Sequence, residues 1–184
     1  MAATRPATES HCHGVLLEIH GLGVLLEGPA GIGKSALARD LLARGHRLVA
    51  DDVVELWRPA AGVVVGRSPE LLRGHLEVRG LGIVNVHKLF GASAIRDRVR
   101  IELVVQLDGG RASLKDRSRG RRTRRRLLGV SLDRIHLSAG SRSVRNNLAG
   151  LIETACLDQE LRLLGLAADG DFERRQQRAI DRNA

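Results

Sequence analysis

Residues 28–35, with the sequence GPAGIGKS, match the phosphate-binding pattern G-x-x-x-x-G-K-[ST] in full. Glycines let a loop fold around an anion with its backbone N–H groups turned inward, and the amino end of a following helix adds partial positive charge. Lys34 can neutralise outer phosphate oxygens, and the Ser35 hydroxyl can ligate Mg²⁺. The residues expected to bind the phosphates are Gly28, Pro29, Ala30, Gly31, Ile32, Gly33, Lys34 and Ser35.

Two adjacent aspartates, Asp51 and Asp52, follow the apolar run RLVA at 47–50. A carboxylate at a strand end beside the phosphate loop can reach the metal or the attacking group in phosphoryl transfer. Neighbouring residues on a strand point to opposite faces. We therefore expect only one of the two aspartates to enter the site, and we expect the other to be solvated.

The loop needs a strand before it and a helix after it, and the sequence supplies both. The runs HGVLLEI at 13–19 and GVLLEG at 23–28 predict two strands joined by a glycine turn. From Lys34 onward, the apolar residues take helical spacing on one face, and Gly45 provides a stop. The chemistry-bearing residues are thus predicted at a strand–loop–helix junction.

The remaining pattern alternates short strands with helical segments. Strands are predicted in 47–57, 63–66, 99–110 and 127–138, and a long helix is predicted over 143–164. SPELLRG at 68–74 predicts one or two helical turns with Ser68 as the cap. The order of elements indicates an α/β domain with a central sheet, the phosphate loop at a strand end, and a long carboxy-terminal helix.

Composition places limits on the class of protein. The chain has 184 residues, 43% of them apolar and only 2% aromatic, which suits one domain with an aliphatic core. Two distant cysteines, Cys12 and Cys156, and no secretory-signal pattern indicate reduced thiols in a cytoplasm. The apolar runs fall short of the roughly 20 residues that span a bilayer, so no membrane segment is predicted.

The formal net charge of +9 is concentrated in one segment. Residues 111–126 carry nine Lys or Arg and one Asp, so the remainder has 21 basic against 20 acidic residues. This pattern favours a basic loop between strands. Nucleic-acid binding is not expected, because two Phe and one Trp offer no aromatic platform for bases. Docking of an acidic partner surface remains an alternative role for the segment.

Several motifs together resemble a known family. HGV at 13–15, the phosphate loop, RGHRLVADD at 44–52, and LEVRGLGIVNV at 76–86 followed by LFG are similar to the catalytic domain of bacterial HPr kinase/phosphorylase. The resemblance is good over residues 11–107 and poor beyond them. It implies a P-loop fold akin to phosphoenolpyruvate carboxykinase, with flanking helices, and a homo-oligomer that is a hexamer in the family.

The resemblance also implies roles for particular residues. Asp52 would be the proton acceptor that activates a target serine, and the proton donor in the reverse, phosphorolytic reaction. His13 and Lys34 would be active-site residues, and Ser35 and Glu77 would bind magnesium. Arg117 is the nearest candidate for the active-site arginine.

The implied activity is an ATP- and Mg²⁺-dependent protein-serine kinase. Its substrate would be HPr, the phosphocarrier of the sugar phosphotransferase system, or a paralogue of HPr. Phosphorolysis stays open, because the family segment tied to dephosphorylation has no clear counterpart in 137–149. A kinase of the same fold with another protein or a small molecule as acceptor is the alternative.

The implied domain organisation is a catalytic domain at 11–166, with its basic loop at 111–126. Residues 1–10 are expected to be disordered, and the charged tail at 167–184 helical or disordered. Only twelve residues precede His13, which predicts a short form without the additional amino-terminal domain of longer members. A metal site in HCH at 11–13 is not expected, and the other histidines are interpreted as surface or capping residues: His20, His46, His75, His87 and His136.

Overall fold

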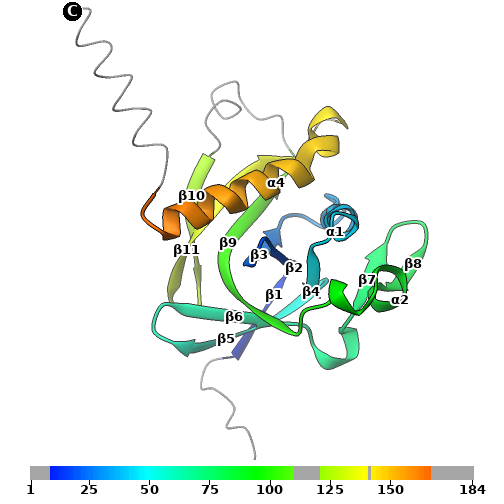
Figure 1. The fold of residues 1–184 in the computed structure, drawn as a ribbon, viewed down its shortest axis with the longest axis horizontal. Coiled ribbons are helices and arrows are strands. Elements are labelled where there is room, and N and C mark those ends of the chain that lie inside the picture. Colours follow the sequence, from blue (N-terminus) through cyan, green and yellow to red (C-terminus); the bar gives the residue numbers. More distant parts are fainter. Residues whose placement is uncertain (1–8, 110–120, 141, 167–184) are drawn as a thin grey trace, which may run out of the picture.

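A single, strongly curved sheet of nine strands organises the molecule (Figure 1). The structure is a computed structural model that describes residues 9–109, 121–140 and 142–166. The strands run in the order β1 (Glu9–His13), β5 (Val53–Ala60), β6 (Val63–Arg67), β9 (Arg98–Asp108), β3 (Leu22–Glu27), β2 (Val15–Ile19) and β4 (Arg47–Ala50). β11 (Val130–Ser138) pairs with β9 and carries β10 (Arg121–Leu127).

The long strand β9 connects the parts of the sheet. Its first residues, 98–100, pair antiparallel with β6. Its later residues pair parallel with β3 over 101–106 and with β11 over 103–108. β3 lies between β9 and β2 in the sheet. The end of β3, from which the phosphate loop emerges, is therefore held in the interior of the sheet.

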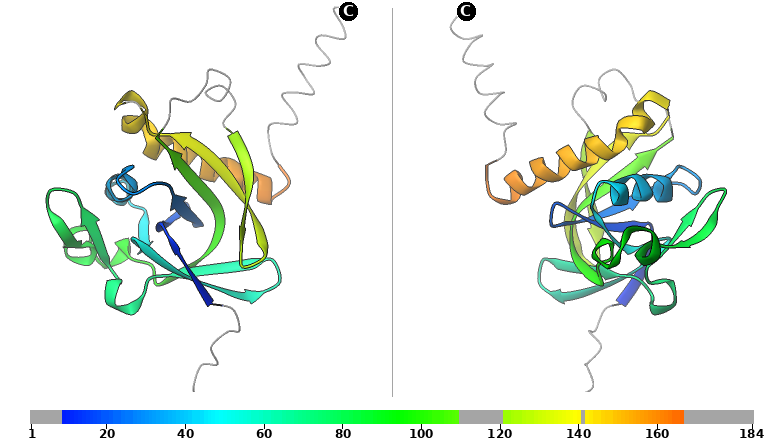
Figure 2. Two further views of the ribbon diagram at one scale, coloured as in Figure 1. Left: turned by 180° about the vertical axis from the view of Figure 1, so that it is seen from behind. Right: turned by 45° about the vertical axis from the view of Figure 1, so that its right-hand side comes forward.

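Helices cover one face of this sheet. α1 (Lys34–Ala43) and α4 (Arg142–Leu163) lie over β2, β3 and β9 (Figures 1 and 2). The hairpin β7 (His75–Val78) and β8 (Gly82–Asn85) and the short helix α2 (Val86–Phe90) flank α1. Two 3₁₀ turns, η1 (Glu70–Leu72) and η2 (Ala92–Ala94), complete the connections.

The central strands are buried on both faces. Leu17 of β2 packs into the cluster that contains α1 and α4, whereas its neighbour Leu16 packs into a second cluster with β5 and β6. The curled sheet covers the second face. Burial on both sides explains why β2 and β3 read as continuous apolar runs without polar alternation.

Most predicted elements are confirmed, and four details were wrong. The strand predicted over 47–57 is broken at Asp51 and Asp52 into β4 and β5. Ser68 is not a cap, since the residue before η1 is Pro69 and the Ser68 hydroxyl donates to the Pro69 carbonyl. Residues 9 and 10, which we expected to be disordered, belong to β1. Residues 121–126 of the predicted basic loop form β10, in which Arg122, Arg124 and Arg125 pair with acidic side chains, whereas 110–120 lie outside the described residues.

The two cysteines are free and buried to different extents. Burial, the largest cause, raises the pKa of the Cys12 thiol to about 11 and that of Cys156 to about 12. Both thiols are therefore protonated near neutral pH. Within the part of the chain that the structure describes, no helix is long and apolar enough to cross a membrane.

Candidate active site

The phosphate loop lies where the sequence predicts it, between β3 and α1. Gly33 precedes the helix with φ 108°, and Gly31 has φ 75°, a region that residues with a Cβ rarely adopt. At Gly28, a Cβ would lie 2.7 Å from the carbonyl oxygen of Leu107. Backbone conformation and close approach to β9 thus explain the need for glycine at these positions.

Lys34 begins α1 and folds back over the loop. Its Nζ donates to the carbonyl of Gly28 at 2.8 Å and to that of Pro29 at 3.1 Å. The ammonium group therefore lies at the mouth of the loop, next to the helix amino end. This arrangement concentrates positive charge where phosphate oxygens would bind.

Asp51 is the hub of the site. It is only 6% exposed, and its Oδ1 accepts a hydrogen bond from Ser35 Oγ at 3.1 Å. Its Oδ2 accepts one from the backbone N–H of Glu77 at 2.8 Å. One carboxylate thereby connects the phosphate loop to β7. Burial raises the pKa of Asp51, and the hydrogen bonds from Glu77 and Ser35 partly offset that rise.

Asp52 lies in a different environment from its neighbour. The N–H of Val53 donates to the carbonyl of Asp51 at 2.8 Å, which makes a three-residue turn with Asp52 at its centre. Asp52 takes φ +67°, an unfavourable value for a residue with a side chain. This turn projects the carboxylate outward, where its side chain is 66% exposed.

His13 is the partner of Asp52. Its Nδ1 lies 3.1 Å from Asp52 Oδ1. The pairing of β1 with β5 produces this contact, because His13 is in register with Val53 and the N–H of Gly14 donates to the carbonyl of Asp52. The result is an exposed imidazole–carboxylate pair one residue from the buried hub.

Glu77 lies on β7 and is exposed. Its backbone N–H donates a hydrogen bond to Asp51. Ser35 and Asp51 bring a hydroxyl and a carboxylate together here, and oxygen donors of this kind are the ones that Mg²⁺ prefers. The oxygen donors at this junction therefore fit magnesium, with the backbone of Glu77 held next to them. Arg117 lies outside the described residues.

The expectation for the aspartate pair was partly wrong. We expected one aspartate to enter the site and the other to be solvated, but Asp51 is buried and holds both residues predicted to bind magnesium. The alternation argument failed because β4 ends at Ala50 and the chain turns at Asp52. The signal for Asp51 was its position at the end of a buried strand next to the phosphate loop.

The histidines were also partly misassigned. His46 is buried, and its Nε2 lies 2.9 Å from Oε1 of Glu153, so it is not a surface residue. Its backbone N–H does donate to the carbonyl of Leu41 at the end of α1, at 3.2 Å. His136 is likewise partly buried and contacts Asp108. His20 and His87 are exposed, as expected.

Comparison with known proteins matches most of the chain to one family. The family model for the HPr Serine kinase C-terminal domain matches residues 4–176, so the match extends well past residue 107, where the motif resemblance fades. The HPr kinase/phosphorylase of Bordetella pertussis is 42% identical over 169 residues, which are 91% of this chain and 54% of that protein. The HPr kinase/phosphorylase of Halalkalibacterium halodurans is 44% identical over 170 residues, covering 92% of this chain and 54% of that protein.

A solved structure shows the same fold. The Hpr(Ser) kinase/phosphatase from Coxiella burnetii superposes with a TM-score of 0.74 at 31% sequence identity, covering 84% of this chain and 98% of that one. The α/β, P-loop-containing fold class is thereby confirmed. The chain spans about half the length of the curated relatives it matches. By the extent of the family match and the identity to these relatives, the chain belongs to the HPr serine kinase C-terminal domain family.

Proposed function

We propose that this chain is an ATP-dependent protein-serine kinase whose acceptor is HPr or an HPr paralogue. The observation that carries the proposal is the division between two adjacent aspartates at the phosphate loop. Asp51 is buried and holds the loop serine, while Asp52 is exposed beside His13. An exposed carboxylate can meet a hydroxyl on a protein surface, which a buried one cannot.

In this proposal, residues 28–35 bind the phosphates of ATP. The backbone N–H groups of the loop and Lys34 hold the phosphate oxygens. When ATP binds, the Lys34 ammonium group gives up its hydrogen bonds to the loop carbonyls and donates to the phosphate oxygens. Ser35 and Glu77 hold Mg²⁺, which neutralises charge on the phosphates when it is bound. Asp51 holds the Ser35 hydroxyl and the backbone of Glu77 in place through its two hydrogen bonds.

Asp52 acts as the base in the proposed reaction. Its carboxylate accepts the proton of the incoming serine hydroxyl as the hydroxyl oxygen forms its bond to the γ-phosphorus and the bond to ADP breaks. His13 positions the carboxylate through the 3.1 Å contact. The rate enhancement then comes mostly from positioning and from electrostatic stabilisation of the transferring group.

Several finer points belong to the same proposal. The relatives are named kinase/phosphorylase or kinase/phosphatase, which supports the reverse reaction, with Asp52 protonating the serine oxygen as inorganic phosphate attacks. A homo-oligomer, hexameric in the family, and a cytoplasmic location are further expectations. Arg117 is proposed as the active-site arginine from the motif resemblance alone.

One assay tests the proposal in both directions. The purified chain is incubated with HPr, Mg²⁺ and ATP, and the mass of HPr is measured before and after a chase with excess inorganic phosphate. We expect the mass of one phosphoryl group to appear in the first stage and to be lost in the second. A radiolabelled panel of metabolites serves as the comparison, and label on a metabolite alone would assign a different acceptor to the same site.

A further inference from the structure

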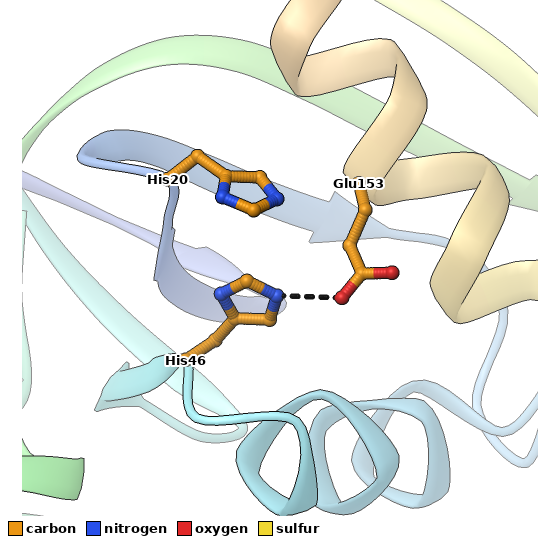
Figure 3. A group of neighbouring side chains, drawn as sticks. All are labelled: His20, His46 and Glu153. Atoms are coloured by element: carbon orange, nitrogen blue, oxygen red, sulfur yellow. Dashed lines mark hydrogen bonds and ion pairs between the residues drawn. The ribbon is translucent and has the colours of Figure 1, made fainter.

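A second cluster of ligating side chains lies at the opposite end of α1 from the phosphate loop. His20 lies in the turn between β2 and β3, His46 lies between α1 and β4, and Glu153 lies in α4. One nitrogen or oxygen atom from each side chain lies within 4.8 Å of the other two. Figure 3 shows the two imidazole rings and the carboxylate converging from three separate segments.

The contacts within the cluster are specific. His46 Nε2 lies 2.9 Å from Glu153 Oε1, and the His20 ring packs edge-on against the His46 ring with 4.9 Å between centroids. Arg44 donates to the other oxygen, Glu153 Oε2, at 3.0 Å. The carboxylate is therefore oriented by Arg44 through one oxygen and presents the other to the imidazoles.

We propose that His20, His46 and Glu153 form a binding site for a divalent transition metal ion, with zinc as the best match. Two imidazoles and one carboxylate are a common ligand set for zinc, and imidazole nitrogen disfavours Mg²⁺ and Ca²⁺. The site is separate from the oxygen ligands at the phosphate loop, and it does not depend on the proposed kinase activity.

The adjustment that zinc requires is small. Tetrahedral bonds of about 2.0–2.1 Å place ligand atoms roughly 3.3 Å apart. The His46–Glu153 contact of 2.9 Å must lengthen slightly, and the other separations, at most 4.8 Å, must shorten. His20 can supply most of that movement, because it is exposed and its ring contact with His46 is its only side-chain partner among the described residues.

The turn between β2 and β3 fixes the place of His20. His20 has φ 49° and Gly21 has φ 82°, the positive values that a two-residue hairpin loop requires at both positions. From this turn, the His20 ring packs edge-on against the His46 ring.

A bound ion would join the carboxy-terminal end of α1 to α4 and to the turn between β2 and β3. Because α1 begins with Lys34 and Ser35, the ion would brace the helix that carries the phosphate loop. An ion that binds the folded chain alone also raises the unfolding temperature by mass action. Zinc should therefore stabilise the fold without occupying the phosphate site.

The test uses the full chain, stripped of metal by a chelator and kept in excess Mg²⁺. Zn²⁺ is titrated by calorimetry, and Co²⁺ is titrated by its visible absorption as a report on tetrahedral geometry. We expect one equivalent to bind and the unfolding temperature to rise. His20→Ala and Glu153→Gln should each lower zinc affinity at least ~10-fold, the lower range seen when the support of a metal site is lost.

The matched controls separate this site from other histidines. His87→Ala removes an exposed histidine of α2, and it should leave zinc affinity unchanged. His13→Ala tests the exposed histidine at the proposed active site. The proposal is overturned if the wild type binds no zinc, if His20→Ala binds zinc as tightly as the wild type, or if only His13→Ala loses binding. His20→Ala is expected to fold, since the side chain is exposed.

Discussion

Asp51 and Asp52 are adjacent in sequence and occupy opposite environments. Asp51 is 6% exposed and accepts hydrogen bonds from the phosphate loop and from β7, whereas the side chain of Asp52 is 66% exposed and contacts His13. The same chemical group can therefore hold a site together or act on a substrate, depending on burial. The difference predicts that Asp51 governs stability and Asp52 governs turnover.

The largest expected effect is on turnover. Asp52→Asn should lower the rate of phosphoryl transfer to HPr by about 10²–10⁴-fold, the usual contribution of a general base. Nucleotide binding and the unfolding temperature should be unchanged, because the carboxylate is exposed. Single-turnover phosphorylation and thermal unfolding measure the two quantities. Asp40→Asn, an exposed aspartate of α1, is the control; an Asp52→Asn protein as fast as the wild type would remove the base assignment.

The next effect is on stability. Asp51→Ala leaves the hydroxyl of Ser35 and the N–H of Glu77 without their acceptor. Both groups are partly buried, and a buried group left unsatisfied costs about 1–3 kcal/mol, so the free energy of unfolding should fall by about that much. Urea denaturation measures the change. A midpoint equal to that of Asp52→Asn would mean that the two aspartates do not divide their roles as burial indicates.

A smaller effect is expected in the pH dependence of stability. Burial is the chief cause that raises the pKa of Asp51 in the folded state above the ordinary value of 3.8. Because the folded state then binds the proton more tightly, the contribution of Asp51 is greatest below 3.8 and is lost as pH rises through the raised folded pKa. The stability of the wild type relative to Asp51→Asn should therefore decline over that window. Denaturation of both proteins at successive pH values tests the sign, and a rising difference would contradict it.

The smallest effect is expected at the partner of Asp52. The His13 and Asp52 side chains are 82% and 66% exposed, and exposed ion pairs contribute about 0–1 kcal/mol. His13→Ala should thus leave stability nearly unchanged and reduce transfer less than Asp52→Asn does. Rates for His13→Ala, Asp52→Asn and the double variant show whether the pair acts together. His11→Ala, on the same strand, is the control; equal losses from His11→Ala and His13→Ala would remove the positioning role.

Sequence patterns identified the strand, loop and helix of the phosphate-loop motif, since that signal is local. The periodicity change at Lys34 and the glycines at 28, 31 and 33 each follow from backbone geometry over a few residues. The motif resemblance added Asp52, His13 and Glu77 to the predicted site. The break between β4 and β5 was missed because strand-forming residues resume at Val53, directly after the two aspartates.

The sequence by itself determined the α/β class, the phosphate loop and the carboxylates beside it. Only the tertiary structure decided which aspartate is buried, because that depends on how β7 and the phosphate loop meet at the end of β4. It also decided that His20, His46 and Glu153 meet, although His20 and Glu153 are 133 positions apart in the sequence. Contacts between distant segments depend on how sheet and helices pack, which no short pattern encodes.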